Sequence, residues 1–172
     1  MMRHFRFATL CFTLTMLQLS VSRAQTTPVP NAPIPTQIAA AKKVFIANAG
    51  GDQLTEDDPI FTGGPDRAYN QFYAAIKNWG RFNIVGSPAE ADLLLEIRQE
   101  VQIGSLGGKA GGFATPLFRL EIRDPKTNAL LWAFHIHFQF GAGQANSDRN
   151  FDQVVNRLAM ELRALVTPAN QP

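Results

Sequence analysis

Three stretches in the second half of the chain alternate between apolar and polar side chains, and this pattern constrains the fold more than any other feature. The first runs from Asp92 to Ile103, the second from Leu117 to Arg123, and the third from Leu130 to Phe140. A period of two is typical of strands with one buried and one solvated face. Asp124 to Asn128 has the composition of a tight turn, so we expect the second and third strands to form an antiparallel hairpin.

Two other segments predict amphipathic helices. Apolar residues at three- and four-residue spacing predict a helix from about Arg67 to Trp79, with Asp66 as its N-cap and Gly80 as its C-terminal stop. A second apolar stripe predicts a terminal helix that begins near Asn150, where Gln153 could complete a capping box. The residues of this second stripe are Phe151, Val154, Val155, Leu158, Leu162 and Leu165.

Short β-rich runs at residues 42–48 and 81–85 predict two further strands, so the expected order is β-α-β-β-β-β-α. Both helices have one apolar side and three strands have one polar face. The economical arrangement is therefore an α+β fold of two layers, with a mixed five-stranded sheet and two helices on one face. We expect Trp132 and Leu158 to be buried between the sheet and the terminal helix. The expected inner face of the last strand comprises Leu130, Trp132, Phe134, Ile136, Phe138 and Phe140.

The start of the chain has the organisation of a cleavable secretory signal peptide. Basic residues precede an apolar run over residues 7–21, which is too short to span a bilayer as a helix. Ser22 and Ala24 suit signal-peptidase cleavage before Gln25. We therefore expect residues 1–24 to be removed on export.

The segment that follows carries four closely spaced prolines, a composition typical of an extended tether. The expected organisation is a signal peptide over residues 1–24, a proline-rich tether over 25–41, a single α+β domain over 42–167 and a tail over 168–172. A docking motif within the proline-rich segment is the minor alternative to a plain spacer.

Cysteine content and charge exclude several classes of function. Cys11 is the only cysteine and follows Leu10, whereas a lipoprotein signal requires a small residue at that position. Cleavage would leave a mature chain without disulfides or thiol ligands. Loss of the three leader arginines leaves 13 Lys+Arg against 14 Asp+Glu, a net charge of −1. We therefore expect no nucleic-acid partner and no stable membrane insertion after cleavage.

The order of elements, together with three short motifs, resembles a group of small exported bacterial domains. The motifs are Ala-Glu-Ala-Asp-Leu-Leu-Leu from residue 89, Leu-Glu-Ile-Arg-Asp-Pro-Lys-Thr from residue 120, and Leu131-Trp132. The group includes the TolB amino-terminal domain, the curli-assembly lipoprotein and the penicillin-binding-protein activator lipoproteins, and the chain is more similar still to uncharacterised exported proteins of this pattern. The resemblance covers about residues 42–166. It implies an envelope adaptor that binds a partner protein, and it carries over no catalytic residue.

His135 and His137 lie two positions apart on the expected last strand, so their imidazoles share one face. Such a pair can hold two corners of a zinc or copper site, and Glu121 on the neighbouring strand is the nearest third ligand by position. The mature chain has no other histidine. Two polar residues on a solvated sheet face are the alternative interpretation.

Other candidate motifs fail on spacing. The glycine-rich segment 104–112 resembles a phosphate-binding loop, but Ala110 stands where Ser or Thr is required and a strand follows instead of a helix. Four acids between residues 52 and 58 lack the ligand spacing of a calcium-binding EF-hand loop. Glu96 and Glu100 share a strand face but lie about 13 Å apart, too far for a glycosidase pair.

Charges on the polar faces of the first two alternating strands predict their register. If these strands are antiparallel neighbours, opposed residues of opposite sign stabilise the pairing. One register gives three such pairs: Glu96–Arg123, Arg98–Glu121 and Glu100–Arg119. A self-neutralised face of this kind argues against a highly charged ligand.

These observations predict an exported, non-enzymatic binding or adaptor domain of the bacterial cell envelope, either periplasmic or secreted. We expect its partner to be another envelope protein, and we expect no cofactor. The alternative is a small metal-dependent enzyme that uses His135 and His137.

Overall fold

The computed structural model describes residues 32–51, 61–105, 112–139 and 141–167. The expected signal peptide, residues 25–31 of the expected tether and the acids of the first long loop lie outside the described residues. The elements are α1 (Thr36–Ala40), β1 (Lys43–Gly51), α2 (Arg67–Trp79), β2 (Asn83–Ile84), a 3-10 turn η1 (Pro88–Glu90), β3 (Leu93–Ser105), β4 (Gly112–Arg123), β5 (Leu130–His137) and α3 (Gln144–Val166).

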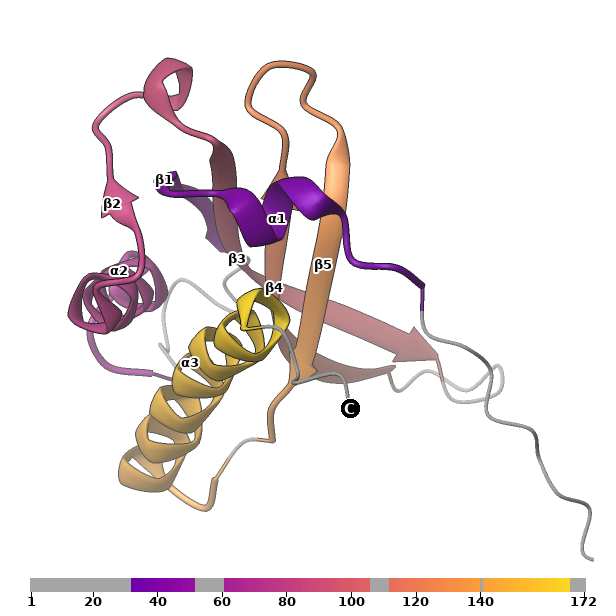
Figure 1. Cartoon of the computed structure of the whole chain (residues 1–172). Helices are drawn as coiled ribbons and strands as arrows, with labels where there is room; N and C mark the ends of the chain where they lie inside the picture. Colours follow the sequence, from indigo (N-terminus) through magenta and orange to yellow (C-terminus); the bar gives the residue numbers. More distant parts are fainter. Residues whose placement is uncertain (1–31, 52–60, 106–111, 140, 168–172) are drawn as a thin grey trace, which may run out of the picture. The chain divides into compact units, whose positions relative to one another are not determined.

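The strands form one mixed five-stranded sheet in the order β2-β1-β3-β4-β5 (Figure 1). β1 pairs in parallel with β2 and β3, whereas β3–β4 and β4–β5 are antiparallel. In the β4–β5 turn, the Asp124 carboxylate accepts a hydrogen bond from the backbone N–H of Lys126 at 2.8 Å, and Asn128 adopts a φ of 58°. The predicted fold class, strand number and hairpin are confirmed.

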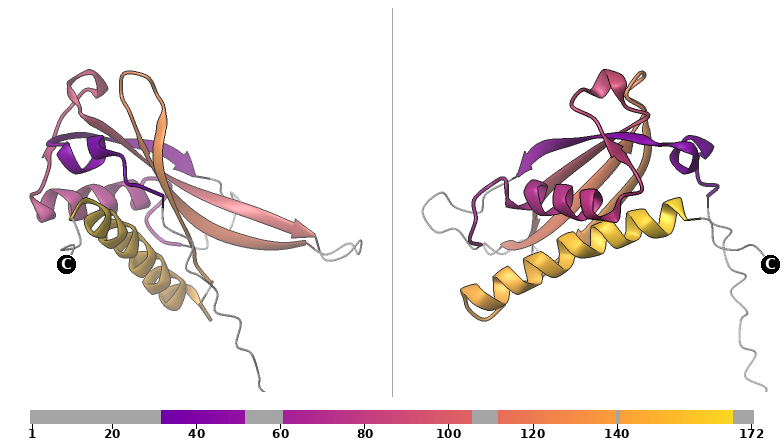
Figure 2. Two further views of the ribbon diagram at one scale, coloured as in Figure 1. Left: turned by 45° about the vertical axis from the view of Figure 1, so that its right-hand side comes forward. Right: turned by 60° about the vertical axis from the view of Figure 1, so that its left-hand side comes forward.

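Both long helices cover the same face of the sheet (Figure 2). Their apolar stripes pack with the inner-face residues of β1, β3 and β4 into one core, in which Phe72, Leu95 and Leu158 are fully buried. The two-layer arrangement and the burial of Leu158 are confirmed. Trp132 is only partly buried and packs against this core instead of being enclosed by it.

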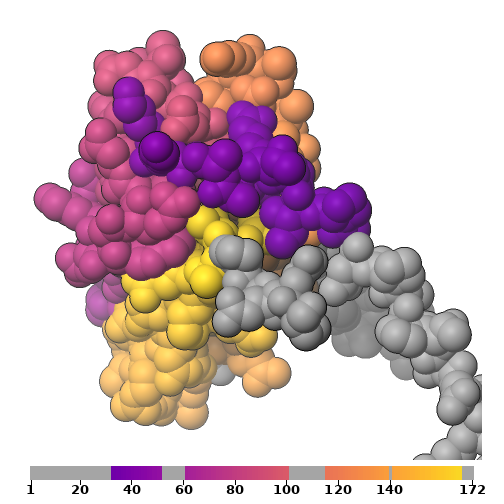
Figure 3. All heavy atoms as spheres, viewed as in Figure 1, coloured from indigo at the N-terminus to yellow at the C-terminus, as the bar shows by residue number. Residues whose placement is uncertain are grey.

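The folded body begins before the boundary predicted at Lys42. α1 occupies positions assigned to the tether, and Ile38 within it is fully buried in the core. Figure 3 shows α1, in indigo, lying directly on the surface of the body. The side chain of Gln37 donates a hydrogen bond to the backbone carbonyl of Asp92 at 3.2 Å. The prolines of this segment end at Pro35, so a short helix can form directly after them.

α2 has the predicted bounds, and Gly80 ends it in the left-handed conformation with a φ of 70°. Asp66, the expected N-cap, makes no side-chain bond to the helix backbone. Its carboxylate instead accepts a hydrogen bond from the amide of Asn48 at 2.6 Å, which joins the start of α2 to β1.

α3 begins at Gln144, well before the predicted start near Asn150, so the predicted capping box is wrong. The first residues of α3 are mostly polar, and a search for apolar periodicity does not detect them. Polar contacts with α2 hold them in place. Arg67 donates to Asp148 at 2.5 Å and to Asp152 at 2.6 Å, and these bonds fix the two helices against each other.

The β3–β4 register differs by two residues from the charge-based prediction. Arg98 lies opposite Arg119, and Glu96 lies opposite Glu121. The prediction is wrong because it counted only directly opposed pairs, whereas arginine side chains are long enough to reach diagonal neighbours.

Burial also selects the observed register. Leu95 lies opposite Ile122, and both side chains are fully buried. The predicted register would have set Leu95 against Asp124, beyond the end of β4.

A bulge alters the start of β5. Ile122 lies opposite Trp132 while Arg123 lies opposite Leu130, so β5 has one extra residue, Leu131, at this point. The bulge turns Leu130 to the solvated face, where it is 48% exposed. The prediction that Leu130 lies on the inner face is therefore wrong.

Candidate binding surface

The sheet face opposite α2 and α3 carries six charged side chains from β3 and β4. We call this surface the charged face, and its residues are Glu96, Arg98, Glu100, Arg119, Glu121 and Arg123. They alternate with core residues along each strand, which directs them away from the core as the sequence predicted. With Ala49 of β1 they line a hollow of about 290 Å³.

The β4 arginines are held between carboxylates. Arg123 lies 2.5 Å from Glu121 and 2.8 Å from Glu96. Arg119 forms a close ion pair with Glu121 and lies 3.5 Å from Glu100. Two of the three ion pairs predicted from the sequence are therefore present, but they run along the diagonals of the ladder instead of straight across it.

Glu121 is the centre of this network. It is only 8% exposed and accepts hydrogen bonds or ion pairs from two arginines. The hydrogen bond from Arg123 to Glu121 is the main cause that raises the pKa of that guanidinium, and the charge of Glu96 adds to it. The Nε atom of Arg119 is buried and has no hydrogen-bond partner among the described residues. Three arginines and three glutamates leave the charged face locally neutral.

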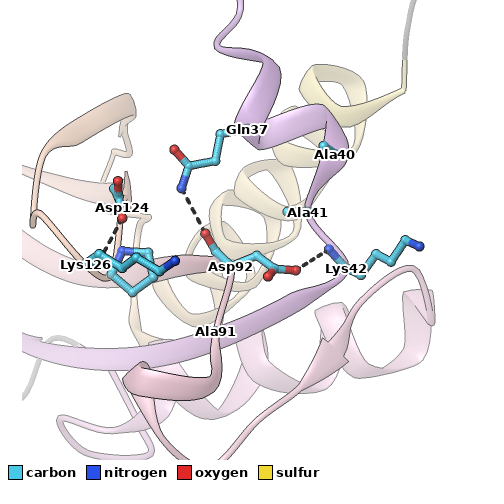
Figure 4. Close-up of a pocket in the computed structure, with 9 residues that line it drawn as sticks. Gln37, Ala40, Ala41, Lys42, Ala91, Asp92, Asp124 and Lys126 are labelled. Carbon is cyan, nitrogen blue, oxygen red and sulfur yellow. Dashed lines mark hydrogen bonds between the residues drawn. The ribbon is translucent and has the colours of Figure 1, made fainter.

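A second hollow, of about 360 Å³, lies where α1 meets the start of β3 and the β4–β5 turn (Figure 4). The Asp92 carboxylate accepts hydrogen bonds from the backbone N–H groups of Lys42 and Lys43, each at 2.9 Å. These two bonds hold the pKa of Asp92 below its ordinary value. The polar groups of this hollow join β1 and α1 to β3, so we assign them a structural role.

His135 and His137 lie on the solvated side of β5, and both are exposed. His135 is opposite Arg119 in the ladder. Glu121, the expected third metal ligand, lies opposite Ala133 and is engaged by arginines. In the part of the chain that the structure describes, no three His, Cys, Asp or Glu side chains gather as a metal site. The structure thus brings the two histidines together but does not bring Glu121 to them.

A third hollow, of about 360 Å³, runs between β5 and α3. It is lined by residues 134–137 of β5 and by Arg157 and Glu161 of α3. These two side chains are 3.6 Å apart and are 63% and 42% exposed. Sequence reasoning missed this hollow because it depends on where α3 crosses the sheet, which no local pattern signals.

No helix within the described ranges is long and apolar enough to cross a membrane. The glycine-rich segment falls mostly outside those ranges, between the end of β3 and the start of β4.

No family model matches the sequence, and no curated protein matches it. Among solved structures, the chain is similar to the PelC dodecamer from Paraburkholderia phytofirmans, with 14% identity, 81% of this chain and 96% of that chain covered, and a TM-score of 0.39. It is similar to the LpoB C-terminal domain from Salmonella enterica, with 13% identity, coverage of 58% and 84%, and a TM-score of 0.36. It is also similar to the rare lipoprotein B from Shewanella oneidensis, with 9% identity, coverage of 72% and 92%, and a TM-score of 0.38. Of these three neighbours, the Shewanella protein is named as a lipoprotein. At these TM-scores the likeness carries no argument about function.

Proposed function

We propose that this chain is an exported, non-enzymatic binding domain of the bacterial cell envelope, which holds a partner protein against its charged face. The observation that carries the proposal is the charged face itself. The two long helices cover the other side of the sheet (Figure 2), so these six side chains lie on its outward face, five of them at least partly exposed and Glu121 nearly buried at their centre. Strand spacing fixes their donors and acceptors in a regular pattern, which suits recognition of another protein surface.

The alternation of charge defines the chemistry of the partner. Because three arginines and three glutamates balance one another, the surface suits a folded protein with interleaved charges better than a polyanion or a polycation. Arg98, whose side chain is 48% exposed, is the most accessible of its arginines. A partner would gain hydrogen bonds to outward atoms of the network without having to break the pairs already formed.

Export is the second part of the proposal, and the leader and proline-rich segment support it. The domain would act in the periplasm or outside the cell, separated from its amino terminus by a short spacer. Mass spectrometry of the protein recovered from an expressing bacterium should identify Gln25 as the mature amino terminus. Recovery of a membrane form that retains residues 1–24 would contradict this part.

Site-specific photo-crosslinking tests the binding surface. A photoreactive amino acid is placed at Arg98 in the full chain, and the chain is expressed in its own bacterium. We expect a discrete cross-link to one envelope protein. The same substitution at Met160, which is 58% exposed on α3, is the matched control and should give no such product.

Binding measurements with this chain and the cross-linked protein, both purified, then test whether charge on the charged face contributes to the affinity. We expect Arg98→Glu to weaken binding of the cross-linked protein by about tenfold or more, because it sets a like charge against the partner's carboxylates. Equal cross-linking from both positions, or unchanged affinity for Arg98→Glu, would show that the charged face is not the binding surface.

A further inference from the structure

β5 is an edge strand, and after the bulge near its start it carries none of the residue types that usually protect an edge. Among the described strands, none pairs with its far side. Its eight residues include no proline and no Lys, Arg, Asp or Glu. Proteins normally use such residues, or a very short strand, to prevent pairing with another chain. An edge of this length and composition is a template for an additional strand.

The outward backbone hydrogen-bonding groups of this edge belong to Ala133 and the two histidines. The backbone N–H of Phe138 donates to the carbonyl of Pro116 at 3.1 Å, so the even-numbered residues of β5 face β4. The backbone groups of Ala133, His135 and His137 therefore point away from the sheet. An added strand would hydrogen-bond at these positions and would lie beside both imidazoles.

We propose that a second copy of this chain supplies that strand, by antiparallel β5–β5 pairing about a two-fold axis, and that the histidines of both copies then bind a zinc ion. Odd-numbered residues must pair with odd-numbered residues, because only these present free backbone groups. Every register of this kind keeps His135 and His137 of both copies on one face. When His135 opposes His137 of the other copy, their Cβ atoms lie about 4.5–5.5 Å apart.

Two copies together supply enough histidines to bind zinc, whereas one chain supplies too few. Zinc in proteins is held by three or four protein ligands, and imidazole nitrogen is one of its preferred ligands. One chain brings two imidazoles to this face, and a two-fold pair brings four. Arg119, opposite His135, does not repel the ion as an unpaired cation would, since it is held by Glu100 and Glu121.

The surface beside the edge is self-complementary. A two-fold interface sets one surface patch against itself, so a charged patch must carry both signs. The hollow along β5 carries Arg157 and Glu161, one cation and one anion. The proline-rich segment of the same chain is a poor occupant of the edge, because proline has no backbone N–H to donate to the ladder.

Sedimentation velocity of the purified mature protein tests the proposal. We expect a dimer with added zinc and a monomer with a chelator. Zinc at about 100 times its dissociation constant should tighten the dimer by up to about 100-fold, since it binds the dimer and not the monomer. The double variant His135→Ala/His137→Ala should lose this response and keep its thermal midpoint.

Ala133→Pro separates strand pairing from metal binding. It removes an N–H that points to the free edge, so it should leave the β4–β5 ladder intact and give a monomer even with zinc. Met160→Ala is the matched control and should dimerise as the parent does.

A chain that stays monomeric at all zinc concentrations overturns the proposal. A dimer that survives both the chelator and the double histidine change overturns the metal site. Stoichiometric zinc on monomeric Ala133→Pro overturns the shared site in favour of one within a single chain. None of these outcomes bears on the charged face, so they remain distinct from failure of the proposed function.

Discussion

Arg98 and Arg119 occupy directly opposed positions on β3 and β4, yet both guanidinium groups approach the same carboxylate, Glu100, at 3.9 and 3.5 Å. Opposed like charges destabilise a sheet when nothing lies between them. Here a carboxylate from the adjacent row of the same face screens them. The ion pairs on this face therefore run along each strand and across the diagonals, and none of those between described residues joins directly opposed positions.

Glu121→Gln should destabilise the domain by about 1–3 kcal/mol, the usual range for losing a charged hydrogen-bond partner in a nearly buried setting. The change keeps the shape of the side chain but leaves Arg119 and Arg123 with one carboxylate fewer. Urea denaturation measures the difference in the free energy of unfolding.

Glu161→Gln is the control for this prediction, because it removes one partner of an exposed pair on α3. Its effect should be below about 0.5 kcal/mol. Equal losses for the two variants would mean that the charged face contributes no more to stability than an ordinary surface pair.

The contrast between the correct fold and the wrong register has a physical basis. Alternation in β3, β4 and β5 reports burial directly, so the strands and their faces could be predicted. The register depends on which arginine reaches which glutamate, and this requires side-chain length and the position of the Asp124–Asn128 turn. The bulge at Leu131 and the early start of α3 also depend on tertiary contacts. Neither feature is marked by a pattern of apolar residues in the local sequence.

Leu158→Ala should cost about 2–5 kcal/mol in the free energy of unfolding, because Leu158 is fully buried beneath the sheet and truncation leaves a cavity. Met160→Ala, two positions along the same helix but 58% exposed, should cost less than about 0.5 kcal/mol. Chemical denaturation of both variants provides the comparison. A small loss for Leu158→Ala would mean that α3 does not pack on the core.

Gly80→Ala should destabilise by about 1–2 kcal/mol, through backbone conformation and not through contact. Gly80 has a φ of 70°, and a Cβ atom there would meet no atom within 4 Å. Gly86 also has open space around a built Cβ, but it is outside the left-handed region. Gly86→Ala should therefore be neutral or stabilising by up to about 1 kcal/mol. Similar thermal midpoints for the two variants would contradict the role of Gly80 as the helix stop.

The candidate sites were predictable to different degrees. The six residues of the charged face and the shared face of His135 and His137 follow from strand periodicity alone. Strand periodicity does not show that Glu121 pairs with Arg119 and Arg123 instead of lying beside the histidines. That choice depends on how the side chains pack in three dimensions. Strand periodicity also does not show that β5 lies at the edge of the sheet, because this depends on the order of the strands.

Asp92→Asn should lower stability at neutral pH and have a diminishing effect in acid. The backbone N–H groups of Lys42 and Lys43 hold the pKa of Asp92 below its ordinary value. A carboxyl with a lowered folded-state pKa stabilises the fold above its unfolded-state pKa of about 3.9, and that contribution disappears as the pH falls through the folded-state value. Urea denaturation over a pH series should show the gap between parent and variant closing below about pH 4. Glu90→Gln, in the neighbouring η1 turn, leaves the Asp92 contacts intact and serves as the control. A gap of constant size from neutral to acid pH would mean that these hydrogen bonds do not depend on the Asp92 charge.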